Sequence, residues 1–538
     1  MNVIDKQFVT AWLGLFAALI VTRHLTAEES SCAQLKQARL RDIQIQSAED
    51  IQSGTRERSP GKPGEGPELP AFCRVRGEIE QRTGADGKHY GIHFELNLPA
   101  SWNGKFLFQG GGGLDGFLAP ATGGIPLAHS SGAPALVRTY AVVSTDGGHQ
   151  GMDASFGSEQ QARLDYAYQQ LGKTADVARE LISRYYGREP SRSYFMGCSN
   201  GGREAMMAAQ RYPLKFDGVV AGNPGFHLSH AAIAEVWDTI AFSAIAPKDA
   251  SGTPILANAF SDADLKLVSR AVLEACDAKD GLKDGEIYSF EACHFNPAVL
   301  TCRGAKADTC LSREQVSALQ KSFAGPTDSS GKALYSDWRY DSGIADPGWR
   351  MWKLGTSQTA KPNAANATLG FDSMSRYFMS PPERNYDPYR TDFDTIAEQV
   401  AETHAIHDAT SVQMSTFASR GGKMLIYTGQ SDPVFSAADQ IAYFRRLTAA
   451  SGGQEEISKW ARLFLVPGMG HCGGGPTVDD FDPLTALENW VENNKPPDRI
   501  IAKGAAFPAR TRPLCAYPKT AHYKGSGNPN SIESFECR

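Results

Sequence analysis

Residues 197–201 (GCSNG) have the G-x-S-x-G spacing that places a serine on a sharp turn between a strand and a helix. An apolar, strand-like run, 193–196, precedes the motif, and a helix-like run, 203–211, follows it. Small residues are needed at both ends of the motif because strand and helix approach each other closely there. The sequence therefore predicts that Ser199 is the nucleophile of a hydrolase.

A serine nucleophile requires a base, and the base requires an acid that holds it in place. His471 lies in a glycine-rich loop directly after a late apolar run, and Asp432 follows the apolar run before that one. The order serine, acid, histidine along the chain is that of α/β-hydrolases. We predict Ser199, Asp432 and His471 as the catalytic residues, with Asp439 as the alternative acid.

The negative oxygen that forms during acyl transfer needs backbone N–H donors. The first should come from Asn200, the residue after the nucleophile. The second should come from the glycine run 110–113, which follows the apolar run 105–109; Gly113 is the predicted donor, and the other glycines of the run are the alternatives. The alternative for this run is a flexible loop without a catalytic role.

The ten cysteines predict five disulfides, because an even count in an exported chain indicates pairing. Cys198 precedes the nucleophile and Cys472 follows the base, so contact between Ser199 and His471 would bring these two cysteines together. Two buried free thiols are the alternative. Short spacing favours three further local pairs, which are Cys276–Cys293, Cys302–Cys310 and Cys515–Cys537.

Residues 276–287 (CDAKDGLKDGEI) form an acidic loop that can wrap a hard cation such as Ca²⁺ with oxygen ligands. The predicted ligands are the carboxylates of Asp277, Asp280 and Asp284 and the backbone carbonyls of Leu282 and Glu286. The expected role is structural, because a serine triad needs no metal, and no organic cofactor is expected. The alternative is a solvated turn.

Apolar strands that run into glycine-rich turns alternate with helical stretches before His227, which predicts a mostly parallel sheet with helices on both faces. This rhythm resumes at 423–427 and 462–466. The pattern indicates an α/β-hydrolase fold with a large insertion, and the polar stretch 46–70 indicates a surface arm. An insertion between these late strands would lie at the C-terminal edge of the sheet, where such folds bind ligands, and would shape a substrate pocket. The predicted division is a catalytic domain, 28–227 and 411–538, and a lid domain, 228–410, that carries the calcium loop.

Composition and the first residues indicate an exported globular protein. The 538 residues are 41% hydrophobic and 21% charged, and the net charge of −6 argues against a nucleic-acid partner. Residues 1–27 resemble a signal peptide, with Lys6 before the apolar run 11–21 and Ala27 at the cleavage position. That run is short for a bilayer span, and a retained membrane anchor is the alternative. We expect a secreted or periplasmic protein with no membrane span after removal of the signal.

Taken together, these residues resemble the tannase and feruloyl esterase family, which also contains bacterial hydrolases of mono(2-hydroxyethyl) terephthalate. The family's Cys-Ser, Asp and His-Cys arrangement is matched by Cys198-Ser199, Asp432 and His471-Cys472, and the resemblance extends from about Cys32 onward. It implies a calcium loop in the lid and a disulfide between Cys32 and Cys73.

The stretches GCSNGGREAMM, FSDADL and ARTRPLC are similar to the terephthalate-monoester branch. This similarity implies that an aromatic acyl pocket is lined by Trp352, Phe371, Ser375 and Phe435, and aromatic lid core is the alternative. Two departures stand out. The branch has a lid arginine shortly before a Gly-Phe pair, which is Gly370-Phe371 here, but residues 366–369 (NATL) of this chain include no cationic side chain. The branch also has an acidic residue at the position where this chain has Asn200. Arg376 is a candidate replacement for the arginine.

The sequence thus predicts a secreted serine carboxylesterase that hydrolyses esters of aromatic carboxylic acids through an acyl-enzyme on Ser199. The acid, of feruloyl, galloyl or terephthaloyl type, stays open. The alternatives are a serine peptidase with the same triad and a catalytically silent hydrolase fold that serves in binding.

Overall fold

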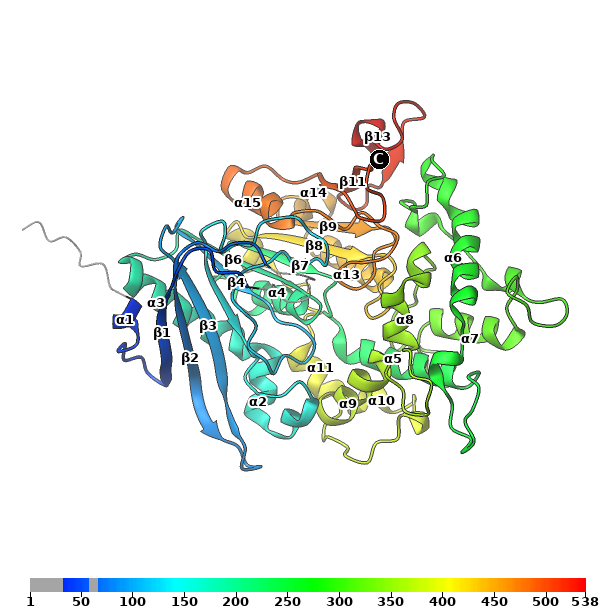
Figure 1. The fold of residues 1–538 in the computed structure, drawn as a ribbon, viewed down its shortest axis with the longest axis horizontal. Helices are drawn as coiled ribbons and strands as arrows, with labels where there is room; N and C mark the ends of the chain where they lie inside the picture. The colour runs from blue at the N-terminus through cyan, green and yellow to red at the C-terminus, as the bar shows by residue number, and fades with distance from the viewer. Residues whose placement is uncertain (1–31, 58–65) are drawn as a thin grey trace, which may run out of the picture.

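The computed structural model describes residues 32–57 and 66–538; the predicted signal peptide, residues 1–27, lies outside this part. A nine-stranded sheet crosses the molecule with helices on both faces (Figure 1). β1, β2, β3 and β5 pair antiparallel, and the remaining neighbours pair in parallel, as the strand–turn–helix rhythm predicted. In spatial order the strands are β1 (Ile43–Ile51), β2 (Phe72–Thr83), β3 (His89–Pro99), β5 (Ala141–Thr145), β4 (Lys105–Gln109), β6 (Arg192–Cys198), β7 (Gly218–Gly222), β8 (Lys423–Gly429) and β9 (Ala461–Val466).

Alternate residues of the central strands pack into two hydrophobic cores, one on each face of the sheet. Phe195 of β6 faces the core that also holds α3, α4 and α13, whereas Tyr194 and Met196 face the core that holds α15. Burying both faces explains why these strands read as apolar runs. The helices of the sheet domain are α1 (Cys32–Leu35), α2 (Gln160–Leu164), α3 (Gln170–Tyr186), α4 (Asn200–Arg211), α13 (Ala437–Ala450), α14 (Gln454–Ile457) and α15 (Pro483–Asn493).

The prediction of a surface arm over 46–70 is wrong for its first part. β1 is an edge strand that pairs with β2 from Ile43 to Ile51. Its sequence, IQIQSAEDI, is polar because much of the strand stays partly exposed, while Ile43, Ile45 and Ala48 pack against the core. An edge strand with one solvated face tolerates such residues.

Between β7 and β8 the chain leaves the sheet and builds a helical layer that lies to the right and below in Figure 1. The predicted lid, 228–410, falls within this interval. It has a hydrophobic core of its own that includes Phe242, Val268, Leu319 and Trp349. Its helices are α5 (Leu228–Ser243), α6 (Asp262–Cys276), α7 (Arg313–Phe323), α8 (Pro347–Lys353), α9 (Phe371–Ser373), α10 (Ile396–Gln399) and α11 (Ala401–His407), with α12 (Ser415–Ser419) leading back to β8.

Short 3₁₀ and π turns complete the helical content, and two of them matter for the site. Asn366–Gly370 and Met374–Phe378 are π-helical turns on either side of α9. The others are Ala154–Ser158, Asp165–Gln169, Leu256–Asn258, Asp277–Asp280, Phe290–Ala292, Pro297–Leu300, Ser342–Ala345, Pro388–Arg390 and Ile532–Ser534.

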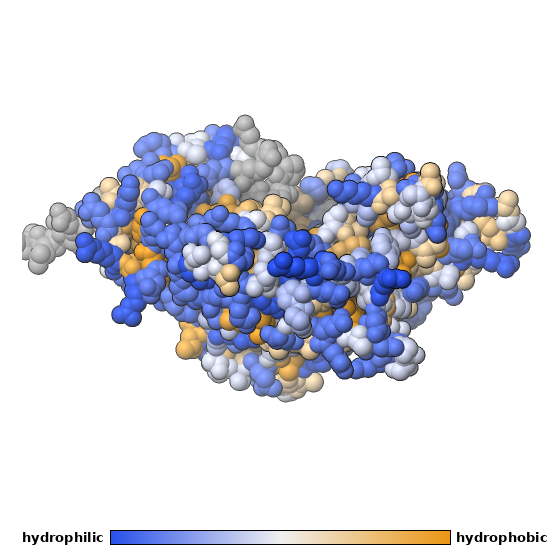
Figure 2. Space-filling view, turned by 90° about the horizontal axis from the view of Figure 1, so that it is seen from below, coloured by the Kyte–Doolittle hydropathy of each residue, from blue (hydrophilic) through white to orange (hydrophobic). Residues whose placement is uncertain are grey.

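The chain ends in two small antiparallel sheets near the top of Figure 1; β11 contacts β9, and β12 contacts the turn Asp277–Asp280 that follows α6. They are formed by β10 (Arg499–Ala502) with β11 (Arg512–Cys515), and by β12 (Ala521–Tyr523) with β13 (Phe535–Cys537). The face drawn in Figure 2 is largely hydrophilic, with hydrophobic residues in small groups. Within residues 32–57 and 66–538, no helix combines the length and the hydrophobicity that crossing a membrane requires.

Candidate active site

Ser199 occupies the sharp turn between β6 and α4, with backbone angles φ 63° and ψ −124°. Few non-glycine residues adopt a positive φ, so the turn is strained. The flanking glycines allow it: a Cβ on Gly197 would lie 2.5 Å from the backbone of Gly201, and one on Gly201 would lie 2.6 Å from the carbonyl oxygen of Gly111. The motif therefore forms the strand–turn–helix that the spacing predicted.

The three predicted catalytic side chains meet at the carboxyl ends of β6, β8 and β9. His471 Nε2 lies 2.8 Å from Ser199 Oγ, and His471 Nδ1 lies 2.9 Å from Asp432 Oδ2. The carboxylate accepts from Nδ1–H, which leaves the lone pair of Nε2 to take the serine proton. The arrangement can activate a serine for acyl transfer.

Both carboxylate oxygens of Asp432 accept hydrogen bonds from the surrounding protein. Its Oδ2 also accepts a hydrogen bond from Asn223 Nδ2 at 2.7 Å, and its Oδ1 accepts from the N–H groups of Val434 and Phe435 at 2.8 and 3.2 Å. The alternative acid, Asp439, instead lies 3.3 Å from His227 Nδ1. The structure therefore places Asp432, and not Asp439, beside His471.

The five predicted disulfides are all present, and none of the ten cysteines is free. Cys198 and Cys472 are bonded with their Cα atoms 6.1 Å apart, at a sequence separation of 274. This bond joins the residue before the nucleophile to the residue after the base. The remaining pairs are Cys32–Cys73, Cys276–Cys293, Cys302–Cys310 and Cys515–Cys537.

The glycine run after β4 leaves one N–H for a developing negative charge. Gly110 donates to the Met196 carbonyl, Gly111 to Glu204 Oε2 at 2.9 Å, and Gly112 to Asp115 Oδ1 at 3.0 Å. In the described part of the chain, no acceptor faces the N–H of Gly113, which has a φ of 60°. Gly113 lines the same cavity as Ser199 and Asn200, so the two predicted donors lie beside the nucleophile.

A buried polar network behind the nucleophile fixes this loop. Asn200 Nδ2 donates to Asp115 Oδ1 at 2.8 Å, and Arg203 Nε donates to Asn200 Oδ1 at 2.7 Å. Burial raises the pKa of Asp115 well above its usual range, and the neighbouring Glu204 carboxylate raises it further. An acidic residue at position 200 would add a third carboxylate here. The amide at position 200, where the terephthalate branch has an acidic residue, thus helps to hold Asp115 and the glycine loop that Asp115 binds.

The cavity in front of Ser199 has a volume of about 230 Å³. Trp352 and Phe435 line it and meet the ring of His471 edge-on, with centroids 5.2 and 5.3 Å away. Among the described residues its lining contains no lysine or arginine. The lining residues are Gly113, Leu114, Ser199, Asn200, Leu228, Ala232, Glu235, Trp352, Leu369, Ser373, Phe378, Val434, Phe435, His471 and Cys472.

Two predicted pocket residues, Phe371 and Ser375, lie outside this lining. The Phe371 ring packs edge-on against Tyr389, and the Ser375 hydroxyl donates to the Asp372 carbonyl. Leu369, Ser373 and Phe378 take their places. The π-helical turn Asn366–Gly370 directly precedes Phe371, and such a turn adds a residue and rotates the faces that follow it.

The lid cation that the terephthalate branch would use has no replacement in the cavity. Asn366 is fully buried outside the lining, and Arg376 pairs with Asp372 at 3.3 Å on the surface. Glu235 of α5 faces the cavity instead, with no hydrogen-bond partner for its carboxyl group in the described part of the chain. Burial raises the pKa of Glu235 to about 8, against a smaller opposing effect of Lys353, which pairs with Asp238. The substrate would thus meet a largely neutral carboxylic acid.

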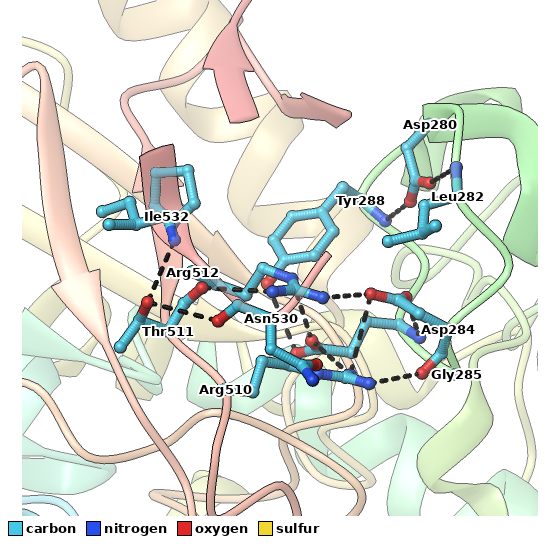
Figure 3. Close-up of polar contacts among 12 residues, drawn as sticks. Asp280, Leu282, Asp284, Gly285, Tyr288, Arg510, Thr511, Arg512, Asn530 and Ile532 are labelled. Carbon is cyan, nitrogen blue, oxygen red and sulfur yellow. Dashed lines mark hydrogen bonds and ion pairs between the residues drawn. The ribbon is translucent and has the colours of Figure 1, made fainter. Parts of the chain in front are cut away.

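The acidic loop begins where α6 ends, and the C-terminal segment that carries Arg510 and Arg512 lies against it (Figure 3). Asp277 accepts from the N–H groups of Asp284 and Gly285, and Asp280 accepts from those of Leu282 and Tyr288. Arg512 ion-pairs with Asp284, and Arg510 Nη1 lies 2.8 Å from Glu286 Oε2. The loop is therefore tied both to itself and to β11.

The donor types of the loop, carboxylate and carbonyl oxygens, are those that a hard cation takes. Burial, together with the neighbouring carboxylates of Asp284 and Asp277, raises the pKa of Asp280 to about 7. Such mutual repulsion is what a bound divalent cation relieves. The carbonyl oxygens of Leu282 and Glu286 accept no hydrogen bond within the described residues. The Glu286 side chain, by contrast, forms ion pairs with Arg510 and Arg512 of the C-terminal segment.

Three functional residues escaped the sequence analysis: Asn223, Glu235 and Leu228. Asn223 follows β7 as Asp432 follows β8, and this position after a strand was the signal that could have identified it. Glu235 and Leu228 share one helix face with spacing that any amphipathic helix shows, so no signal singled them out.

A family model described as tannase and feruloyl esterase matches residues 73–538. The mono(2-hydroxyethyl) terephthalate hydrolase of Piscinibacter sakaiensis is 42% identical over 519 residues, covering 87% of this chain and 85% of that protein. A probable feruloyl esterase B-2 of Neosartorya fischeri is 27% identical over 489 residues, covering 87% and 86%.

Two solved structures have the same fold. Feruloyl esterase B from Aspergillus oryzae aligns with a TM-score of 0.79 at 24% identity, covering 95% of this chain and all of that one. Tannin acyl hydrolase from Aspergillus niger aligns with a TM-score of 0.72 at 20% identity, covering 95% of each. These likenesses confirm the α/β-hydrolase fold.

Proposed function

The chain belongs to the tannase and feruloyl esterase family and is a carboxylic ester hydrolase, and we propose that it cleaves esters of aromatic carboxylic acids through an acyl-enzyme on Ser199. The observation that carries the proposal is the chain of contacts from Ser199 Oγ through His471 to Asp432, at 2.8 and 2.9 Å, at the mouth of an aromatic-lined cavity.

The reaction follows from this geometry. Ser199 Oγ attacks the ester carbonyl carbon while His471 Nε2 takes its proton, and Asp432 stabilises the imidazolium that forms. The N–H groups of Gly113 and Asn200 receive the negative oxygen. Collapse expels the alcohol, which takes the proton from His471. Water, deprotonated by the same nitrogen, then hydrolyses the acyl-enzyme and releases the acid.

The cavity supports an aromatic acid as the acyl part. Trp352 and Phe435 offer ring faces and edges next to His471, and leucine and valine side chains supply the remaining apolar surface. A flat ring buries much surface in such a slot. The P. sakaiensis relative is named for a terephthalate monoester, whose acyl part carries a second, ionised carboxylate.

We further propose that this chain prefers uncharged, hydroxyl-bearing acids of the feruloyl or galloyl type. A buried carboxylate needs a cation or several hydrogen-bond donors, and the cavity offers neither lysine nor arginine. The neutral carboxyl of Glu235 can instead exchange hydrogen bonds with a phenolic hydroxyl.

A structural calcium ion in the lid and export from the cell are also proposed. Asp277, Asp280 and Asp284, with the carbonyls of Leu282 and Glu286, would hold the ion, which would supply positive charge and no catalytic step. Five disulfides and no free cysteine support an oxidising compartment. The predicted signal peptide, 1–27, remains a prediction on residues outside the described part.

The test is a comparison of kcat/KM for methyl ferulate, methyl gallate and mono(2-hydroxyethyl) terephthalate, with the amide of ferulic acid as a control for peptidase chemistry. We expect the phenolic esters to lead and the amide to be inert. Ser199→Ala should abolish turnover of every ester while the thermal unfolding midpoint stays unchanged. Near-normal turnover by Ser199→Ala would exclude the serine mechanism, and a leading terephthalate ester would exclude only the proposed acid preference.

A further inference from the structure

A group of three histidines and one aspartate lies at the base of the lid, apart from the triad and the acidic loop. His227 directly precedes α5 and His230 lies in its first turn, while His404 lies on α11 and Asp408 just beyond it. One ring nitrogen of each histidine and one oxygen of Asp408 lie within 4.8 Å of one another. α5 and α11 lie side by side (Figure 1). Spacings of three and four residues put each pair on one helix face.

The rings are oriented as metal ligands are. His404 Nδ1 donates to Asp408 Oδ2 at 2.8 Å. The hydroxyl of Ser229 donates to the same oxygen at 2.6 Å, so its own oxygen accepts from His230 Nδ1, 3.0 Å away. His227 Nδ1 lies 3.3 Å from Asp439 Oδ2.

All of these hydrogen bonds run through Nδ1, and in the described part of the chain none reaches Nε2 of the three rings. Metal-binding histidines commonly donate the other ring N–H to a carboxylate or another oxygen, which fixes the tautomer and the direction of the ring. The second-nitrogen contacts of His227, His230 and His404 therefore match those of a ligand set.

The charges favour a dication. Asp408 and Asp439 are each 6% exposed, and their ion-pair partners among the described residues are histidines, not lysine or arginine. Two carboxylates thus lack a permanent counter-charge.

The donor types select the metal. Imidazole nitrogen suits Zn²⁺ and similar late transition ions, whereas Ca²⁺ and Mg²⁺ require oxygen. Tetrahedral ligands about 2.1 Å from zinc lie roughly 3.4 Å from one another, so the rings need to close by at most about 1.4 Å. The side chains of His227 and His404 are 21% and 34% exposed, which gives an ion a path from solvent.

We propose that His227, His230 and His404 bind one Zn²⁺-class ion, with Asp439 and Asp408 as the carboxylates that orient His227 and His404, and that this ion clamps the two ends of the lid to the sheet domain. α5 begins the lid, α11 ends it, and Asp439 lies on α13 of the sheet domain. Leu228, Ala232 and Glu235 of α5 line the catalytic cavity. The ion would fix the helix that forms one cavity wall, and this proposal stands whether or not the ester specificity is correct.

The experiment is a calorimetric titration of the untagged, full-length protein with Zn²⁺, after treatment with a chelator. The buffer contains enough Ca²⁺ to fill the proposed calcium loop, and metal analysis after dialysis gives the amount of Zn²⁺ that stays bound. We expect one Zn²⁺ per chain and a Zn²⁺-dependent rise of the unfolding midpoint. Co²⁺ in place of Zn²⁺ should give the visible absorption of a tetrahedral site.

The key variant is His404→Gln, because the glutamine amide can still donate to Asp408 while the imidazole ligand is lost. Removing a hydrogen-bond partner of a metal ligand costs roughly 10- to 100-fold in affinity, and we expect a loss of this size for Asp439→Asn. His404→Gln removes a ligand itself and should weaken Zn²⁺ binding by more than this. His294→Ala, at an exposed lid histidine, is the matched control and should bind like wild type.

Two results would overturn the proposal. One is a wild-type protein that takes up no stoichiometric Zn²⁺ while its unfolding shows it to be folded. The other is a His404→Gln variant that binds Zn²⁺ as tightly as wild type and His294→Ala, since the ion would then be adventitious.

Discussion

The catalytic cavity has two walls of different construction. The sheet wall carries Ser199, Asp432 and His471, whose side chains are joined to one another and to Asn223 by hydrogen bonds, and the disulfide Cys198–Cys472 adds a covalent link. The lid wall, with Trp352, Leu369 and Glu235, is largely apolar, and the Glu235 carboxyl group has no hydrogen-bond partner among the described residues. The difference indicates that the sheet wall sets the reaction, whereas a few lid residues set which acid is accepted.

The largest effect should come from breaking the sheet wall at its most buried member. Asp432→Asn should lower kcat by about 10⁴-fold, because the amide would hold His471 in the wrong tautomer. Steady-state kinetics on an aryl ester measures this, with the unfolding midpoint as the control for folding. A loss below about tenfold would mean that another group orients His471.

The next effect concerns the disulfide that joins nucleophile and base. Replacing Cys198 and Cys472 by alanine should lower both kcat and the unfolding midpoint, because the loop of 274 residues loses a constraint of up to about 5 kcal/mol. The matched control is the double replacement of Cys302 and Cys310, which closes only an 8-residue loop in the lid. The control should lose stability without losing kcat, and equal losses of kcat in both variants would contradict the account.

Glu235→Gln should sharpen the comparison by changing the lid wall alone. Its carboxyl pKa of about 8 exceeds the ordinary 4.5, so between these values the folded state binds more protons than the unfolded state. Wild-type stability should therefore fall as pH rises through this window, and the variant should lack that fall. Midpoints measured below about pH 4.5 and above about pH 8 test this.

The same variant tests the choice of acid. Above about pH 8 the ionised Glu235 should repel a terephthalate monoester, and glutamine should raise kcat/KM for this substrate by about tenfold or more. The ratio of kcat/KM for methyl ferulate to that for the monoester is the readout. An unchanged ratio would mean that Glu235 does not face the acyl group.

The smallest effect on rate should come from the acidic loop of the lid. Removing calcium with a chelator should lower the unfolding midpoint, and re-adding Ca²⁺ alone should restore it, while kcat for an aryl ester changes little. Asp280→Asn should abolish the Ca²⁺-dependent part of the midpoint. A midpoint that does not respond to Ca²⁺ in wild type would argue for a turn without an ion.

The sheet wall could be predicted from sequence because its signals are local. Each catalytic residue follows an apolar strand, and the neighbours Cys198 and Cys472 reported the long-range contact. The edge strand β1 was missed, because its solvated face carries the polar residues that also mark loops.

The lid wall could be predicted only in part. Trp352 of the lid lines the cavity as expected, as does Phe435 beside Asp432 in the sheet domain, but Phe371 and Ser375 of the lid do not. Phe371 directly follows the π-helical turn Asn366–Gly370, which rotates the segment by an amount that its sequence does not display. The histidine group was invisible for a related reason, since α5 and α11 meet only after the whole lid has folded between them.

The most direct test of the central claim is to trap the acyl-enzyme. Wild-type protein mixed with an activated aryl ester, quenched in acid within the first turnover and digested, should carry the mass of the acyl group on the peptide that holds Ser199. The Ser199→Ala protein should carry none. An acyl group on a different residue, or steady turnover by Ser199→Ala, would contradict the claim that the sheet wall performs the chemistry.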